Sequence, residues 1–552
     1  MKVNEAVPIA PSLDVAKPET PVISKRILFI SIQTVINAII IGFVAKGLVA
    51  LISLVTNLSF YGRFSFEEAS PAHHALGIWV IAVPVIGGLI VGVMARLGSS
   101  AIRGHGIPEA MEQVLTNDSK IRPIIAWLKP LSAAFAIGTG GPFGAEGPII
   151  ATGGALGSVA GQVMRITPNE RKIMLTAGAV AGMSAIFGTP VAAVLLAIEL
   201  LLFEFSPRSI IPVALACATG TAMHFALFDS APVFQMPEIP AASSQAMMWY
   251  ILLGAVIGVL AAIVSKSVYF IEDLFEKLPV HWMWWPAIGA VAVGVVGYFA
   301  PYTLGVGYSN ISGLLSGSLP LQLVLGLCIL KFISWSVSLG SGTSGGTLAP
   351  LLTIGGATGV ALGMLVLTIA PHSEINLPTC ALIGMAAMFA GAARALLTSI
   401  VFAFETTMQP HGLLPLLGAC TASYFVSFFL MKTSIMTEKI HRRGVATPDA
   451  YSPDVLTSIR AAEVMATGAV FSNTSVYVKP DSTLSFAAGL MDRYSVTELP
   501  VVDNGKVIGV LTAGLILSAY NKQHRVNENY QRTISVKRRG YKMLATIKQR
   551  FV

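Results

Sequence analysis

The sequence predicts an all-α, polytopic membrane protein that ends in a small α/β segment, and three observations lead to this fold class. Hydrophobic residues make up 54% of the 552 residues and charged residues only 12%, with a mean hydropathy of +0.72. A soluble domain usually carries about 25% charged residues. Several apolar runs reach or approach the roughly 20 residues that cross a bilayer. The apolar part also repeats itself, which indicates two homologous halves.

Changes in composition divide the chain into segments. Residues 1–25 are polar and proline-rich without an early apolar core, so we expect a disordered cytoplasmic arm rather than a signal peptide. Residues 26–445 form the predicted membrane domain. They are followed by a polar linker at 446–460, a soluble segment at 461–522 and a basic tail at 523–552.

The distribution of basic residues predicts the orientation in the membrane. Lys25 and Arg26 precede the first apolar run, which favours an inside N-terminus. Residues 521–552 hold nine Lys or Arg and one Glu, a pattern that binds anionic lipid headgroups. No aromatic-basic motif accompanies them, so no nucleic acid is expected as a partner. We predict a multi-pass protein of the inner (plasma) membrane with both termini cytoplasmic.

Two glycine-rich stretches repeat each other at a distance of 202 residues. AIGTGGPFGAEGPIIATGGALGSVAG, from Ala136, aligns without gaps on SLGSGTSGGTLAPLLTIGGATGVALG, from Ser338. The same shift continues to GMSAIF at 182–187 and GMAAMF at 384–389. Repeats of this kind in transporters place the substrate site at the interface of the two halves, near mid-membrane.

Three loops interrupt the apolar runs with Gly and Pro: RGHGIPEA, with Pro108, GAEGP, with Pro148, and GGTLAP, with Pro350. Pro is favoured in the first turn of a helix, so each loop predicts a helix start within the membrane. A helix start exposes backbone N–H groups and a partial positive charge. Several starts aimed at one point therefore form an anion site without a formal cation, from which the anion can leave again.

Glu146 is the only charged residue between Lys129 and Arg165. An ionisable residue inside the membrane is a functional candidate by default. When ionised, its carboxylate can occupy a site built for anions, and when protonated it loses that attraction. We therefore predict that Glu146 gates the site and carries protons; the alternative is a structural, hydrogen-bonded Glu at a helix start.

The three loop motifs resemble a known family. GHGIPE, GAEGP and GGTLAP are similar, in order and spacing, to the motifs GSGIP, G(K/R)EGP and GxFxP of the CLC family of chloride channels and chloride/proton antiporters. SIMTEKIHRRG resembles the last membrane helix of that family. The resemblance covers about residues 26–445 and implies the CLC fold, with two inverted halves, broken helices, and one chloride path in each subunit of a homodimer. It implies no enzyme activity, cofactor or metal.

The resemblance also implies roles for individual residues. Glu146 falls on the gating glutamate, and Met436 stands at the position of an inner-gate tyrosine. His105 takes the place of an inner serine that contacts the anion. The implied anion-binding residues are His105, Gly106, Gly147, Thr347 and Leu348.

Four departures from the family pattern bear on the mechanism. His105 can donate to an anion and make transport pH-sensitive, or it can merely line the inner vestibule. Ala145 removes a basic residue from the outer entrance, and Met436 makes the inner gate less polar. Leu200 falls on the second, inner glutamate of antiporters, with Glu199 one residue before it.

The apolar Leu200 is typical of channels, so we favour a voltage- or pH-gated chloride channel. A chloride/proton antiporter with an altered proton path, in which His105 supplies another proton stop, stays open. A transporter that prefers fluoride or nitrate stays open too. The remaining membrane charges are expected to pair or to lie near helix ends as scaffold residues: Glu199, Glu405, Lys331 and Arg394.

Residues 461–515 predict a β-α-β unit. LSFAAGLM forms an amphipathic helix, and LPVV and KVIGVLT flank the turn Asn504–Gly505. This unit resembles a single CBS motif, and such motifs normally pair, so pairing with the copy in the other subunit is expected. Nucleotide-binding members carry Asp three residues after a Thr or Ser, whereas Leu515 follows Thr512 here. A structural role is therefore favoured over nucleotide binding.

Two other function classes and a disulfide framework are disfavoured. GTSG at 342–345 matches the nucleophile motif of intramembrane serine proteases, but Ser344 would need a nearby membrane histidine as base. Cation paths need rings of carboxylates or carbonyls, whereas helix starts repel cations. Four cysteines lie far apart in apolar runs and are expected to be buried thiols: Cys217, Cys328, Cys380 and Cys420.

Overall fold

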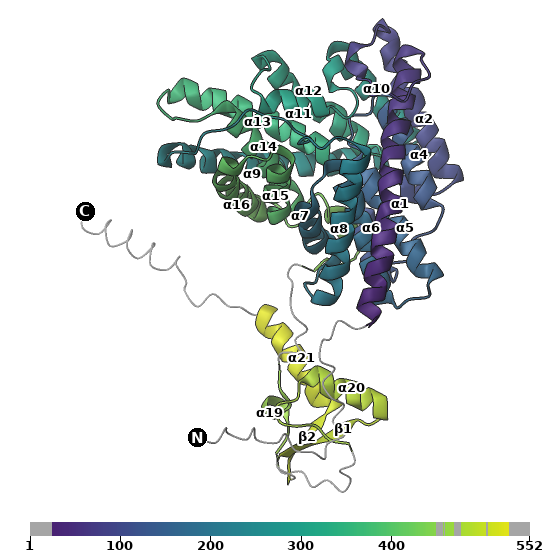
Figure 1. Cartoon of the computed structure of the whole chain (residues 1–552), viewed down its shortest axis with the longest axis vertical. Coiled ribbons are helices and arrows are strands. Elements are labelled where there is room, and N and C mark those ends of the chain that lie inside the picture. Colours follow the sequence, from purple (N-terminus) through teal and green to yellow (C-terminus); the bar gives the residue numbers. More distant parts are fainter. Residues whose placement is uncertain (1–24, 449–455, 457–458, 468–475, 504–505, 529–552) are drawn as a thin grey trace, which may run out of the picture. The chain divides into compact units, whose positions relative to one another are not determined.

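The computed structural model describes residues 25–448, 456, 459–467, 476–503 and 506–528 (Figure 1). It contains two compact units, one at residues 23–449 and one from residue 450 onward. The predicted N-terminal arm up to residue 24, most of the predicted linker and the basic tail from residue 529 lie outside the described residues.

The membrane unit consists of two halves with the same order of elements. The first half holds α1 (Lys25–Thr56), α2 (Ala82–Leu97), α3 (Ile107–Thr116), α4 (Ile125–Gly138), α5 (Glu146–Val163), α6 (Pro168–Phe187), α7 (Pro190–Leu196) and α8 (Pro207–Leu227). The second half holds α9 (Ser244–Glu276), α10 (Trp285–Phe299), α11 (Tyr308–Leu315), α12 (Leu321–Gly340), α13 (Leu348–Ile369), α14 (Leu377–Ala393), α15 (Leu396–Thr407) and α16 (Leu413–Leu430), and α17 (Glu438–Arg442) follows it.

Short irregular turns connect or extend these helices. π-helical turns prolong α1 and α7, at Asn57–Tyr61 and Ala197–Leu202. Single 3-10 turns lie at Pro71–His73, Gly77–Ile81, Ser100–Ile102, Trp282–Trp284, Pro301–Thr303 and Pro410–Gly412.

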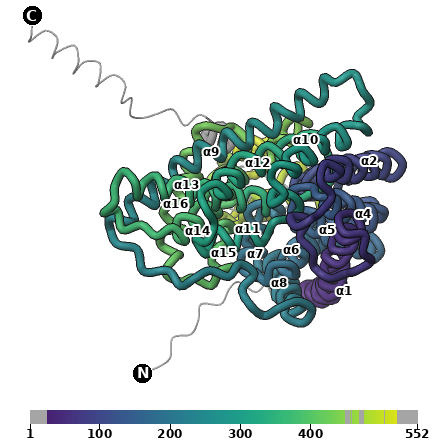
Figure 2. The backbone as a smooth tube through the Cα atoms, turned by 90° about the horizontal axis from the view of Figure 1, so that it is seen from above, coloured from purple at the N-terminus to yellow at the C-terminus, as the bar shows by residue number. Residues whose placement is uncertain are grey.

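The two halves lie side by side, with α1, α4 and α5 on one side and α13, α14 and α16 on the other (Figure 2). Helix pairs recur in matching positions, since α5 packs on α6 as α13 packs on α14, and α1 packs on α8 as α9 packs on α16. The arrangement is the predicted pair of inverted-repeat halves with broken helices.

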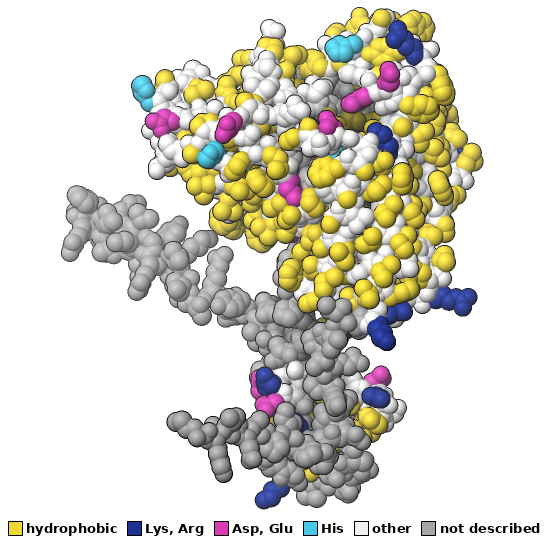
Figure 3. Space-filling model, in the orientation of Figure 1, with side chains coloured by type: hydrophobic (Ala, Val, Ile, Leu, Met, Phe, Trp, Pro, Cys, Tyr) yellow, Lys and Arg dark blue, Asp and Glu magenta, His cyan; other side chains and the backbone are white. Residues whose placement is uncertain are grey.

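Within the described residues, eight helices are long and apolar enough to cross a membrane. These helices also expose large apolar side chains. On α1 the exposed ones are Phe29, Ile32, Ile36 and Phe43. Hydrophobic side chains cover much of the membrane unit in Figure 3. So much exposed apolar surface suits lipid rather than water, and the chain is a multi-pass membrane protein.

The repeat changes register between its glycine loops and the helices that follow. The loops match at a shift of 202, since α5 begins at Glu146 and α13 at Leu348, but α13 has 22 residues and α5 only 18. Because of this added turn, matching residues of the two halves that follow α5 and α13 differ by 206 in residue number rather than by 202. Gly153 approaches the carbonyl of Gly178 as Gly355 approaches that of Gly384. The predicted match of 182–187 with 384–389 at a shift of 202 is therefore wrong.

The halves also cap each other's helices. Glu199, in the π-helical turn after α7, accepts hydrogen bonds from the backbone N–H groups of Leu397 (2.9 Å) and Thr398 (3.0 Å), at the start of α15. Glu405, in α15, accepts from Val191 (3.0 Å) and Ala192 (2.8 Å), at the start of α7. Both carboxylates thus satisfy N–H groups that a helix start leaves unpaired. The predicted scaffold role of this pair matches the geometry.

The C-terminal unit holds α19 (Ala461–Val464), α20 (Leu484–Tyr494), β1 (Glu498–Asp503), β2 (Lys506–Thr512) and α21 (Ala513–Glu528). The antiparallel β1 and β2 form a hairpin and α20 precedes them, as the sequence predicts. The expected β-α-β order is wrong at its start, where the described residues 461–464 form a helical turn. The turn residues 504 and 505 lie outside the described residues.

Replacing either capping carboxylate tests whether each half stabilises a helix start of the other half. Glu405→Ala and Glu199→Ala are each expected to lower the free energy of unfolding by about 1–2 kcal/mol, because helix N–H groups lose their acceptors. Unfolding in mixed detergent micelles measures this change. The control is Glu238→Ala, which removes an exposed carboxylate that caps no helix. Equal stability of all three variants would contradict the capping role.

Candidate functional site

The three glycine loops meet at one place. The backbone of Gly104 pairs with that of Ser344, and the backbone of Gly144 pairs with that of Gly346. Gly104 N donates to Thr343 O (2.9 Å), and Gly346 N donates to Gly144 O (3.1 Å). Loops from both halves therefore bring the starts of α3, α5 and α13 together inside the membrane unit.

Glycine is required where these loops touch. Gly106 has a φ of +96°, and a Cβ there would lie 2.2 Å from Gly147 O. A Cβ on Gly147 would lie 2.2 Å from His105 O and 2.8 Å from Gly346 Cα. The obstacles are backbone atoms, which cannot rotate away. The sequence-predicted residues His105, Gly106 and Gly147 thus lie in direct backbone contact.

Glu146 is fully buried at this meeting point. Its Oε1 accepts a hydrogen bond from Ala349 N at 2.5 Å, at the start of α13. The backbone N–H groups of Leu348 and of Glu146 itself lie near the carboxylate as well. The side chain of one half therefore occupies the N-terminus of a helix from the other half, where backbone dipoles favour negative charge. The implied ligand Leu348 is part of this cradle, together with Ala349, which the sequence did not indicate.

Two buried polar atoms of the same loops have no hydrogen-bond partner among the described residues. They are Nδ1 of His105 and Oγ1 of Thr347, the N-cap residue of α13. An imidazole N–H and a hydroxyl are both donors, which is the chemistry that a small anion needs. A buried unpaired donor costs about 1–3 kcal/mol. Donors of this kind at the meeting point of three helix starts fit an anion better than a metal cation.

A fourth loop reaches the site, which sequence reasoning missed. Gly305 N donates to Gly140 O at 3.0 Å, and Gly307, with a φ of +76°, precedes the start of α11 at Tyr308. The segment GVGYSN stands in the second half where GHGIPE stands in the first. Because it lacks the proline of GHGIPE, composition alone did not mark it as a helix start.

Two fully buried lysines support the loops from matching helices. Lys129 Nζ, in α4, donates to Ile102 O and Gly104 O, both at 2.8 Å. Lys331 Nζ, in α12, donates to Thr303 O and Gly305 O, also at 2.8 Å. The sequence prediction placed Lys331 near a helix end or in a pair, which is wrong, because it lies inside α12 and binds backbone carbonyls. Arg394, by contrast, lies at the end of α14 as predicted.

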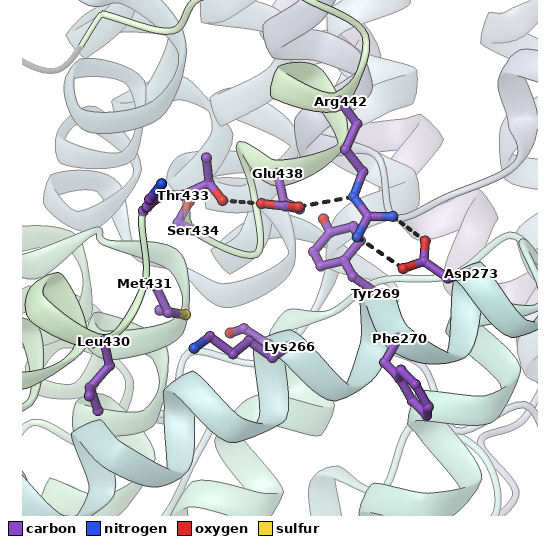
Figure 4. Close-up of a pocket in the computed structure, with 12 residues that line it drawn as sticks. Lys266, Tyr269, Phe270, Asp273, Leu430, Met431, Thr433, Ser434, Glu438 and Arg442 are labelled. Carbon is purple, nitrogen blue, oxygen red and sulfur yellow. Dashed lines mark hydrogen bonds and ion pairs between the residues drawn. The ribbon is translucent and has the colours of Figure 1, made fainter.

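Met436 lies buried in the short segment between α16 and α17. Tyr269 Oη, in α9, donates to Ile435 O at 2.7 Å, next to Met436. Figure 4 shows how Arg442 then joins Asp273 and Glu438 beside that tyrosine, along a cavity of about 460 Å³. This network holds the Met436 segment against α9.

The same region is tied to the His105 loop. Lys439 Nζ, in α17, lies 3.4 Å from Glu109 Oε1, and Glu109 Oε2 accepts from Gly106 N at 2.6 Å. An ion pair and a hydrogen bond therefore link α17 to Gly106, the residue that follows His105.

The residues considered for a protease, a metal site or a disulfide make other contacts or none of the required ones within the described part of the chain. Ser344 Oγ accepts from Ser132 Oγ at 3.0 Å, and among the described residues no hydrogen bond joins it to a histidine. Within the described part of the chain, no three His, Cys, Asp or Glu side chains cluster as metal ligands would. The cysteines are free thiols, with three buried and Cys328 half-buried.

The chain is similar to known transport proteins. The family model of the voltage gated chloride channel matches residues 86–428, and the CBS domain model matches residues 461–522. The H+/Cl− exchange transporter ClcA of Vibrio parahaemolyticus is 28% identical over 386 residues, which cover 66% of this chain and 80% of that protein. The chloride channel protein CLC-e of Arabidopsis thaliana is 29% identical over 374 residues, 63% of this chain and 52% of that one.

Solved structures share the fold. A slow cyanobacterial Cl−/H+ antiporter superposes with a TM-score of 0.64 at 22% identity, covering 74% of this chain and 98% of its own. A eukaryotic CLC transporter superposes with a TM-score of 0.61 at 22% identity, covering 90% and 88%.

The close backbone contact predicts different effects for two glycines of α5. Gly147→Ala is expected to lower the free energy of unfolding by about 1–3 kcal/mol, because the new Cβ meets backbone on both sides. Gly154→Ala is the control, since its nearest atom would lie 3.6 Å away, and it should be neutral or stabilising by up to about 1 kcal/mol. Thermal unfolding in detergent distinguishes them. Equal melting temperatures would show that the loops are not in contact.

Proposed function

The chain belongs to the voltage gated chloride channel family, and from that premise we propose that it conducts chloride passively through a pore that ionised Glu146 closes. The observation that carries this proposal is the hydrogen bond from Ala349 N, at the start of α13, to the buried Glu146 carboxylate. A carboxylate and a chloride ion are both anions that accept from backbone N–H groups. The carboxylate therefore stands in for chloride, and the two compete.

Protonation resolves the competition in favour of chloride. A neutral carboxyl group has lost the charge that helix dipoles attract, so it leaves the cradle more readily. The pore then holds chloride on the backbone of Gly147 and Leu348 and on the Thr347 N–H, with His105 as inner donor. Dipoles without a full positive charge bind chloride moderately and allow it to move on.

Passive conduction is favoured by the surroundings of the missing inner glutamate. Leu200 is buried and apolar, and the carboxylate of the neighbouring Glu199 is already engaged by the start of α15. The leucine side chain therefore offers no second proton-binding group at this position. A proton that reaches Glu146 from inside would therefore need another carrier.

Chloride/proton antiport is the second candidate, because one related protein is named an H+/Cl− exchange transporter and a similar structure is that of a Cl−/H+ antiporter. In that case His105 serves as the inner proton stop, since it lies in backbone contact with Gly147, beside Glu146. A preference for fluoride or nitrate would also originate at His105, in the place of the family's serine.

The biological setting follows from the resemblance and the charge distribution. We place the protein in the plasma membrane as a homodimer with cytoplasmic termini. The CBS segment then serves as a structural, dimer-stabilising element, and the basic tail contacts anionic lipid headgroups.

Chloride efflux from proteoliposomes with simultaneous pH recording tests the coupling. The protein should release chloride without proton movement, and efflux should rise as the pH falls, by up to about tenfold per pH unit while protonated Glu146 is rare. In Glu146→Ala the efflux should be faster and nearly independent of pH.

Proton movement in a fixed ratio to chloride would replace the channel by the antiporter. Unchanged efflux and pH dependence in Glu146→Ala would contradict the gate itself. Glu238→Ala serves again as the control.

His105→Ser tests the inner donor. The variant is expected to change the ratio of chloride to nitrate permeability several-fold and to flatten the pH response, because a titratable donor becomes a neutral one. Ion-substitution currents or anion flux measure the ratio. The control is His224→Ser, which removes a buried histidine that is hydrogen-bonded to Ala185 O and belongs to none of the glycine loops. An unchanged ratio would leave His105 as vestibule lining.

A further inference from the structure

We propose that Tyr308 is a positioning residue for the gate, whose hydroxyl holds the ionised Glu146 side chain in the anion site. The inference rests on the proposed gating role of Glu146. Tyr308 belongs to none of the three glycine motifs, and it comes from the half of the chain opposite to Glu146.

The hydroxyl has a defined direction. Its O–H donates toward Glu146 Oε2, and the two oxygens lie 3.4 Å apart. A carboxylate has no proton to give, so the tyrosine is the donor of this pair. With Ala349 N on Oε1, the carboxylate is held at both oxygens, by a backbone group of α13 and a side chain of α11.

The ring of Tyr308 is kept in place by other aromatic rings. It packs edge-on against Phe187 (5.8 Å between centroids, 68°) and Phe234 (5.9 Å, 63°). Phe187 in turn packs edge-on against Phe402 (5.0 Å, 86°). These arrangements are favourable for aromatic pairs and leave the ring little freedom to rotate. The hydroxyl is therefore presented to Glu146 at little cost in side-chain entropy.

The backbone under Tyr308 is equally constrained. Gly307, in the left-handed region at a φ of +76°, starts α11, and the buried Lys331 binds the carbonyl of Gly305. The equivalent position in the first half is Ile107, which follows Gly106 and has no hydroxyl. Of these two matching positions, only the one in the second half therefore places a hydroxyl donor beside Glu146.

A phenol that donates to a carboxylate stabilises the ionised form more than the neutral form. Tyr308 therefore favours the closed gate, with the carboxylate in the chloride position. Other charged or titratable groups around the pair are His105 in the loop before α3, Lys331 behind Gly307 and Glu68 in the segment before α2. The variants below leave all three unchanged.

Tyr308→Phe removes the hydroxyl and keeps the ring. Chloride efflux from proteoliposomes at neutral pH is expected to rise about three- to tenfold. The midpoint of acid activation should move upward by roughly half a pH unit to one unit, as the loss of one charge-assisted hydrogen bond implies. The matched control is Tyr250→Phe, a buried tyrosine in α9 whose oxygen accepts from Asn376 N, and it should leave both values unchanged.

Combining the variants separates this inference from the proposed function. In the Glu146→Gln background, Tyr308→Phe should have no further effect on the flux or its pH dependence. If Glu146→Gln activates the flux but Tyr308→Phe does not, the positioning role is wrong while the gate stands. If Glu146→Gln changes nothing, the gate itself is wrong. An equal effect of Tyr308→Phe in both backgrounds would assign Tyr308 to packing alone.

Discussion

The structure depends on one constraint, which is that backbone N–H groups at a helix start inside a membrane must find an acceptor without water. In this protein several such starts converge, and a single carboxylate, that of Glu146, is the acceptor for the start of α13. The arrangement attracts anions because peptide dipoles add up where the helices begin. In the proposed function the anion can leave again, because dipoles bind it less tightly than a full positive charge would. In the proposed function, selectivity, gating and proton sensitivity all follow from this one competition.

The rest of the membrane unit keeps the loops rigid enough to maintain that competition. Lys129 and Lys331 bind carbonyls of matching loops, while Glu199 and Glu405 cap helices of the opposite half. Each device satisfies backbone groups that glycine-rich, broken helices would otherwise leave unpaired in an apolar medium. The halves therefore depend on each other, and neither could form the site alone.

The two halves contribute different side chains to the site. The first half supplies the titratable Glu146 and the imidazole of His105, whereas the second supplies the Thr347 hydroxyl and the phenol of Tyr308. The two halves thus share the same arrangement of helices and loops but place different side chains at the site. The carboxylate of Glu199, by contrast, caps the start of α15 rather than lying at this site.

The sequence by itself determined the membrane class, the two halves, the three glycine loops and Glu146 as the lone acid among them. It could do so because apolar run lengths, Gly and Pro spacing and an isolated charge are local properties of the chain. Only the tertiary structure decided the register after α13, the loop before Tyr308 and the position of Lys331 inside α12. These depend on which backbone groups face each other across the two halves, and contacts some 200 residues apart leave no local pattern in the sequence.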